Sequence, residues 1–244
     1  MSSTVIYGVN PVTEALLAGG KVDTVYLAVG LRKSTKREIE QLANQRGVRV
    51  LVISRRELDR MASGGAHQGV LATAEKMPYL ELSQLAKLQQ EPRTVVLCLD
   101  GIQDPRNLGA LARSALAFGA AGIIIPERRS VGITPAAVKA SAGALTRLPV
   151  CRVKNLSRAL DILKEAGFWV SGAVLEGGQA PWEFDPGERV ALVLGSEGSG
   201  VRRGLIEGLD FKVSLPMHND SESLNVSVAG ASILYEWLVR PQKQ

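Results

Sequence analysis

The segment TVVLCLDGIQDPRNLGALARSALAFGAAGIIIPE, residues 94–127, decides the fold class of this 244-residue chain. It begins with an apolar run, passes through a polar turn into an alanine-rich stretch, and ends with a second apolar run. Continuous apolar strands that alternate with helices are typical of a parallel sheet covered on both faces. We therefore predict a strand at 94–100, a helix at 107–119 and a strand at 121–127.

The same alternation extends to both ends of the chain, which predicts an α/β protein throughout. The other strands that we expect are 22–30, 48–54, 67–74, 148–153, 168–175, 189–197 and 211–217. The other expected helices are 34–47, 55–62, 135–145, 155–167, 201–209 and 223–239.

A weakly patterned stretch separates two parts of the chain. Residues 75–93 carry two prolines and no compact strand, so we predict a linker there. The predicted domains are then a small α/β domain at 1–74 and a larger parallel-sheet domain at 94–244.

The composition is that of an ordinary globular protein, with 45% hydrophobic and 22% charged residues. No apolar run reaches the roughly 20 residues that cross a bilayer, and the first residues do not have the pattern of a signal peptide. The two cysteines, Cys98 and Cys151, lie in apolar strand-like runs. We expect them to be reduced core residues in a cytoplasmic protein.

Positive charge is concentrated near the N-terminus. The net charge is +5, and residues 1–74 contribute ten Lys/Arg against six Asp/Glu, a local excess of four. Such an excess favours a polyanion as partner, because neutralising phosphates gives affinity without sequence specificity. A solvated basic surface without a partner fits the charge equally well.

Polar residues follow three predicted strands, at the edge where open α/β sheets bind their ligands. After the strand at 94–100, Asn107 can cap the next helix, and Arg113 lies off its apolar stripe beside small residues. The segment LVLGSEGSG, 192–200, places three glycines where the backbone can approach a ligand. It opens no βαβ unit and lacks the dinucleotide spacing, so a nucleotide-dependent oxidoreductase is disfavoured.

The third polar stretch is SESLNVSVAGASILYEWL, 221–238, at the entrance of a very apolar helix. Ser223 or Asn225 can cap this helix. A cap needs one such residue, so the others are available to a ligand.

In this order, the segments DPRNLGALARSA, LGSEGSGV and LPM…ESLNVSVA resemble the three motifs of the SpoU branch of knotted RNA methyltransferases. The resemblance extends to IYGVNPVTEALL and HQGV, which look like the family's ribosomal-protein-like RNA-binding domain. It implies S-adenosylmethionine held in a C-terminal trefoil knot, a homodimer, and methylation of a guanosine ribose 2′-hydroxyl in bacterial 23S ribosomal RNA.

The resemblance also assigns the candidate site. The residues that look like the family's catalytic polar set are Asn107, Arg113, Glu197, Ser223 and Asn225. Those that look like cofactor-contacting positions are Gly195, Leu215, Met217 and Leu224. Asn219 and Ser221 depart from the family pattern, which often has a glycine and an apolar residue there, and this puts cofactor affinity in question.

A ribose hydroxyl is a very weak acid, so the protein must orient it and help its proton to leave. Arg113 is the expected central catalytic residue, through the adjacent phosphate or by direct abstraction, although a guanidinium stays protonated. Glu197 is expected to fix Arg113 or Asn107. The expected RNA-contacting residues of the N-terminal domain are Arg32, Lys33, Lys36, Arg37, Arg55 and Arg56.

Two alternatives stay open from the sequence. The substrate can be transfer RNA, because relatives share all three motifs. A non-catalytic RNA-binding or ribosome-assembly protein of the same fold is the second, and the complete polar set argues against it. No metal site is expected, since the only histidines, His67 and His218, have no third ligand candidate nearby. His67 is expected instead to order its turn or to contact RNA.

Overall fold

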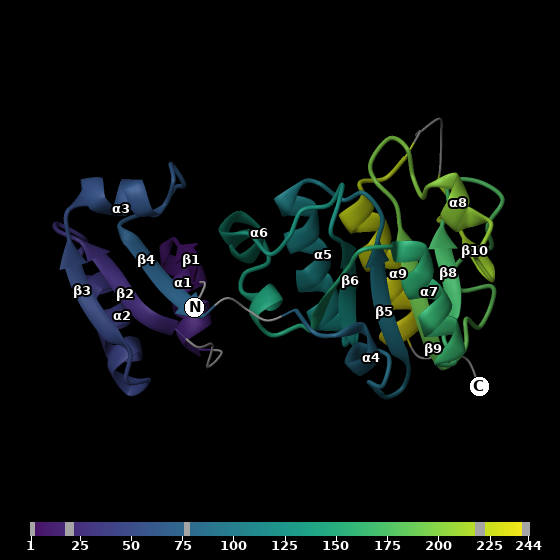
Figure 1. Ribbon diagram of the computed structural model, residues 1–244, viewed down its shortest axis with the longest axis horizontal. Coiled ribbons are helices and arrows are strands. Elements are labelled where there is room, and N and C mark those ends of the chain that lie inside the picture. The colour runs from purple at the N-terminus through teal and green to yellow at the C-terminus, as the bar shows by residue number, and fades with distance from the viewer. Residues whose placement is uncertain (1–2, 18–21, 76–78, 218–222, 241–244) are drawn as a thin grey trace. The chain divides into compact units, whose positions relative to one another are not determined.

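The computed structural model describes residues 3–17, 22–75, 79–217 and 223–240. The chain forms two compact units: Met1–Pro78 with Ile133–Arg147, and Tyr79–Gly132 with Leu148–Gln244 (Figure 1). Residues 79–93, where we expected a linker, are therefore part of the second unit. The insertion Ile133–Arg147, by contrast, groups with the N-terminal unit, because α6 packs on β1.

The first unit contains a four-stranded sheet in the order β1-β4-β2-β3. Strand β4 is antiparallel to β1 and β2, whereas β3 is parallel to β2. Its elements are β1 (Ser3–Tyr7), α1 (Val9–Leu17), β2 (Val22–Ala28), α2 (Lys33–Gln45), β3 (Arg49–Ile53), α3 (Arg55–Met61), β4 (Val70–Glu75), α6 (Pro135–Ala140) and the 3₁₀ turn η1 (Ala144–Thr146). The sequence pattern did not predict β1 or α1.

His67 orders the turn that leads into β4. The backbone N–H of Gly69 donates to His67 Nδ1 at 3.0 Å, and His67 Nε2 lies 2.8 Å from Asp59 Oδ1. The ring is buried, so both nitrogens are satisfied within the unit. This structural role was one of the two that we expected for His67.

The second unit is built on a six-stranded sheet in the order β10-β8-β9-β5-β6-β7, with every pair parallel. This confirms the prediction of a parallel-sheet domain. Its elements are α4 (Leu82–Leu85), β5 (Thr94–Leu99), α5 (Pro105–Phe118), β6 (Gly122–Pro126), β7 (Val150–Val153), α7 (Leu156–Glu165), β8 (Trp169–Ala173), β9 (Arg189–Leu194), α8 (Arg203–Ile206), β10 (Phe211–Val213) and α9 (Val226–Leu238).

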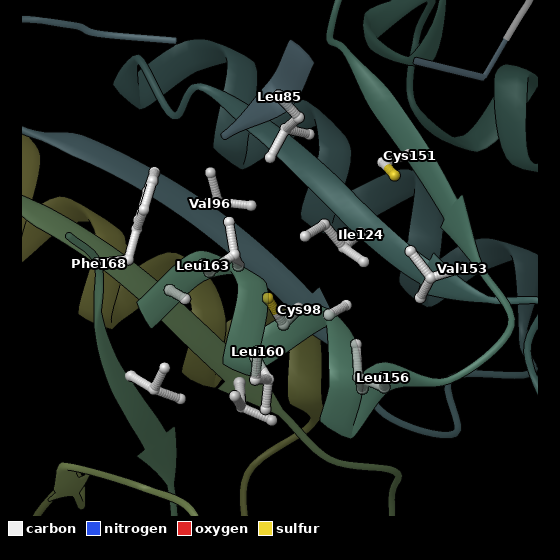
Figure 2. Close-up of a cluster of buried hydrophobic side chains, with 14 of the residues drawn as sticks. Leu85, Val96, Cys98, Ile124, Cys151, Val153, Leu156, Leu160, Leu163 and Phe168 are labelled. Carbon is white, nitrogen blue, oxygen red and sulfur yellow. The ribbon is translucent and has the colours of Figure 1, made fainter. Parts of the chain in front are cut away.

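Helices cover both faces of this sheet (Figure 1). On one face, leucines of α4, α7 and α8 pack against alternate residues of the strands, and Figure 2 shows this core around Cys98, Ile124 and Leu163. On the other face α5 packs against α9. The trefoil knot that the resemblance implies does not follow from the strand order, and it stays a prediction.

The two cysteines are buried members of the first of these cores and are free thiols. Burial raises the pKa of the Cys151 thiol to about 11 and that of Cys98 further still. Neither thiolate is therefore populated at neutral pH. Among the described residues, no helix is long and apolar enough to cross a membrane.

Candidate functional site

The site lies beyond the carboxyl ends of β5 and β9, where a glycine-rich loop follows β9. Ser196 and Gly200 close this loop with two backbone hydrogen bonds, of 3.1 and 2.9 Å. Gly198 and Gly200 adopt φ of 89° and 63°, in the left-handed region that favours glycine. The chain therefore folds back on itself within five residues.

Gly195 lies where the returning chain crosses the end of β9. A Cβ at this position would lie 1.9 Å from the carbonyl carbon of Gly200 and 2.1 Å from the nitrogen of Val201. Backbone fills the place of a side chain, so only glycine fits.

Asp100 anchors the far end of the loop. Its carboxylate is 2% exposed and accepts from Arg202 N at 3.0 Å and from Arg202 Nε at 2.7 Å. The hydrogen bond that the Arg202 side chain donates to Asp100 raises the pKa of its guanidinium. Sequence reasoning missed this pair, although an aspartate at the end of an apolar strand was a signal that could have found it.

Three of the predicted catalytic residues form one polar cluster. Asn107 Nδ2 donates to Glu197 Oε1 at 3.0 Å, and Asn225 Nδ2 donates to Asn107 Oδ1 at 3.1 Å. Asn225 Nδ2 also donates to Glu197 Oε1. The residues come from α5, the glycine-rich loop and the start of α9, so the three motifs converge in space. Glu197 thus fixes Asn107, as expected.

Asn225 has a second role as the N-cap of α9. Its Oδ1 accepts from the backbone N–H of Ser227 at 2.9 Å, while its amide nitrogen faces the cluster. Ser223 does not cap the helix. The polar entrance of this apolar helix therefore both starts the helix and supplies a side chain to the site.

The cap that we predicted for α5 was wrong. Asp104, not Asn107, accepts from the Arg106 N–H, and Pro105 occupies the first helical position. The Arg106 side chain also donates to this carboxylate and holds the pKa of Asp104 below its usual range. Asn107 therefore lies in the first turn of α5 with its amide not needed for capping. This amide hydrogen-bonds to Glu197 and Asn225 instead.

A cavity of about 390 Å³ lies beside the cluster, within the size range of small-molecule sites. The loop, the end of β10 and the start of α9 line it, together with Leu175 and Ile233. All four predicted cofactor-contacting residues and two predicted catalytic residues are among its lining: Gly195, Leu215, Met217, Leu224, Glu197 and Ser223.

Arg113 lies apart from this cavity. It is exposed on α5, six residues after Asn107 and so about 120° from it around the helix axis. Within the described ranges no hydrogen bond or ion pair holds its guanidinium, and it does not line the cavity. Its catalytic role stays a prediction.

Two further expectations concern the residues before α9 and a metal site. His218, Asn219, Asp220, Ser221 and Glu222 lie outside the described residues. In the part of the chain that is described, no group of three His, Cys, Asp or Glu could hold a metal ion.

Comparison with known proteins identifies two matching family models. The model of the SpoU rRNA methylase family matches residues 94–235, and that of the substrate-binding domain of RNA 2′-O-ribose methyltransferases matches residues 5–80. The chain is 40% identical over 233 residues to YacO of Bacillus subtilis (strain 168), which is assigned to the TrmH family of tRNA/rRNA methyltransferases. This match covers 95% of the chain and 93% of YacO.

Two solved structures resemble the whole chain. The SpoU methyltransferase AviRb of Streptomyces viridochromogenes, in complex with S-adenosylmethionine, has a TM-score of 0.79 at 25% identity and covers 97% of this chain and 89% of its own. An rRNA methyltransferase of Sinorhizobium meliloti, also with S-adenosylmethionine bound, has a TM-score of 0.77 at 25% identity, covering 96% and 86%.

Proposed function

This chain belongs to the SpoU rRNA methylase family, and we propose that it transfers the methyl group of S-adenosylmethionine to a guanosine ribose 2′-hydroxyl in 23S ribosomal RNA. One observation supports this most directly. The same glycine-rich loop lines a largely apolar cavity and carries Glu197 of the polar cluster. A methyl donor in the cavity and a ribose at the cluster would therefore meet at this loop.

The cavity suits the cofactor that the two similar structures contain. Leu215, Leu224 and Ile233 would hold the flat adenine ring, and the peptide groups of residues 195–200 offer hydrogen bonds to its polar groups. When bound, S-adenosylmethionine supplies a methyl group on a positively charged sulfur, which a hydroxyl oxygen can attack.

The polar residues act on the ribose. Glu197 and Asn225 hold the amide of Asn107 in place, and this amide keeps one N–H and one oxygen lone pair with which to orient the 2′-hydroxyl. Attack of the oxygen on the methyl carbon would break the carbon–sulfur bond of the bound cofactor, and the hydroxyl proton would leave toward the neighbouring phosphate. Arg113, held against that phosphate, lowers the effective pKa of the hydroxyl without losing its own proton.

The enzyme acts as a homodimer in this proposal. The face of α9 that turns away from the sheet exposes Val228, Tyr235 and Val239, at 50, 49 and 43%. Phe118 of α5 contacts Tyr235 at a ring-centroid distance of 5.6 Å, so the two helices share this apolar surface. Arg113 lies on the exposed side of α5 and does not line the cofactor cavity. If two subunits pair through α5 and α9, the Arg113 side chain of one subunit would reach the active site of the other.

The N-terminal unit supplies the broader RNA contact. Val29 N donates to Ile53 O at 2.9 Å, which keeps the ends of the parallel strands β2 and β3 adjacent. Basic residues follow both ends, and all four are exposed: Arg32, Lys33, Arg55 and Arg56. A sugar–phosphate backbone can therefore contact both turns at once.

Replacing Arg55 and Arg56 with glutamine should weaken RNA binding and leave S-adenosylmethionine affinity unchanged. The slope of log affinity against log salt should become shallower by roughly one for each lost phosphate contact. Filter binding of a 23S ribosomal RNA transcript across a salt series measures this. The control is the double variant Arg158→Gln/Arg203→Gln. Both arginines are exposed residues of the second unit, so this variant loses the same amount of charge. An unchanged slope in the N-terminal variant would assign RNA binding elsewhere.

Methyl transfer from labelled cofactor to unmodified 23S ribosomal RNA, with the product nucleotide mapped, tests the function. We expect incorporation at one guanosine ribose, in the cytoplasm where ribosomal RNA is processed. The name of the Bacillus subtilis relative covers transfer RNA as well, so transfer RNA is the second substrate to assay. Cofactor binding without methylation of either RNA would instead support a non-catalytic member of the family.

A further inference from the structure

A second cavity, of about 470 Å³, shares the glycine-rich loop with the first. Ser196, Glu197, Ser199 and Gly200 line both cavities. The second cavity is otherwise formed by the segments that follow β5 and β6, and it includes Asn107. Its lining is polar and charged, whereas leucine, valine and isoleucine dominate that of the first.

Three of the six charged residues that line this second cavity are already in ion pairs: Asp100, Asp104 and Arg202. Asp100 pairs with Arg202, and Asp104 pairs with Arg106. Arg128 and Arg129 are exposed at its wall and, among the described residues, make no hydrogen bond or ion pair with their side chains. Two cations that have no partner in the described part of the chain thus lie at a cavity that is also lined by Asn107 and Glu197.

The segment that carries these arginines is held in place at both ends. Glu127 N donates to Val153 O at 2.8 Å, and Val131 N donates to Ile102 O at 2.8 Å. Arg129 adopts φ of 58°, a left-handed conformation that is uncommon for a residue other than glycine. Such a conformation persists only where the surrounding structure fixes it, and it is most frequent at binding sites.

We propose that the second cavity receives the target nucleotide of the RNA and that Arg128 and Arg129 bind the phosphates on either side of it. This inference rests on the proposed function. The cavity is large enough for a nucleoside. A nucleotide turned out of its stack would place its ribose at Asn107 and Glu197, at the wall shared with the cofactor cavity, while the arginines hold the backbone that enters and leaves.

The test compares wild-type enzyme with Arg128→Gln/Arg129→Gln and with the Arg158→Gln/Arg203→Gln control. A third variant, Arg128→Lys/Arg129→Lys, keeps the charge. The probe is an unmodified 23S ribosomal RNA transcript. The measurements are the KM for RNA, kcat, the salt dependence of RNA binding, S-adenosylmethionine affinity by calorimetry, and the midpoint of thermal unfolding.

For the glutamine variant we expect the KM for RNA to rise at least about tenfold, because each lost charge-assisted contact weakens binding substantially. The salt slope should fall by roughly two, while cofactor affinity and the unfolding midpoint stay at wild-type values. The lysine variant should keep most of the salt slope. A glutamine variant with the KM and slope of the control would overturn the inference and leave the proposed function standing. A wild-type enzyme that methylates no RNA would overturn both.

Discussion

Replacing Arg113 with alanine should lower single-turnover methyl transfer by about 10²–10³-fold, the usual cost of removing one preorganised charge from a transition state. The fold should not change, because the side chain is exposed and, within the described residues, pairs with nothing. S-adenosylmethionine affinity should also stay constant, since Arg113 does not line the cofactor cavity. Rapid-quench kinetics at saturating RNA, calorimetry and thermal unfolding check the three statements.

The conservative variant separates two roles for this arginine. Lysine keeps the positive charge but presents a point charge in place of a planar fork. If Arg113 holds the phosphate next to the reacting ribose, Arg113→Lys should recover part of the rate that Arg113→Ala loses. A wild-type rate for the alanine variant would remove Arg113 from the catalytic set altogether.

Mixing variants tests whether Arg113 acts across subunits. Arg113→Ala and Asn225→Ala are each expected to lose most of the wild-type activity. In a mixed dimer one site then has both substitutions, and the other has neither if the arginine comes from the partner. Activity should therefore return after subunit exchange. If each site uses its own arginine, every site in the mixture has one substitution, and no activity returns.

The sequence predicted the features that depend on local patterns. Continuous apolar runs such as 94–99 indicated a parallel sheet, and the structure confirms it. The polar residues after three strands indicated one site, and Asn107, Glu197 and Asn225 do meet. This succeeded because the carboxyl ends of parallel strands lie at one edge of a sheet, so position along the chain already implies proximity.

The remaining features depend on contacts between distant residues, for which a single sequence carries no pattern. Asp100 was expected only as the last residue of a strand, and its partner Arg202 is 102 positions away. No prediction concerned Arg128 and Arg129, because the hydrogen bond between Val131 and Ile102 that fixes their segment is invisible in the sequence. Asp104 replaced Asn107 as helix cap because both residues suit that role, and only the geometry distinguishes them.

Gly195→Ala should destabilise the second unit and abolish cofactor binding. The added methyl group would lie 1.9 Å from the carbonyl carbon of Gly200, and backbone cannot move aside as a flexible side chain can. The chain from Gly200 to Val201 must shift, and with it the loop that forms both cavities. Overpacking of this kind costs about 3 kcal/mol or more, which corresponds to a fall of roughly 6–12 °C in the unfolding midpoint.

The tryptophans make this measurement specific to the second unit, since Trp169, Trp182 and Trp237 all belong to it. Thermal unfolding followed by tryptophan fluorescence therefore reports on that unit. Gly204→Ala is the matched control, because a methyl group there meets no atom within 4 Å and alanine favours α8. The control should keep wild-type cofactor affinity and a midpoint no lower than wild type. If Gly195→Ala behaves like this control, then the backbone of Gly200 and Val201 does not pack closely against Gly195 at the end of β9. The cofactor cavity would then not depend on that contact.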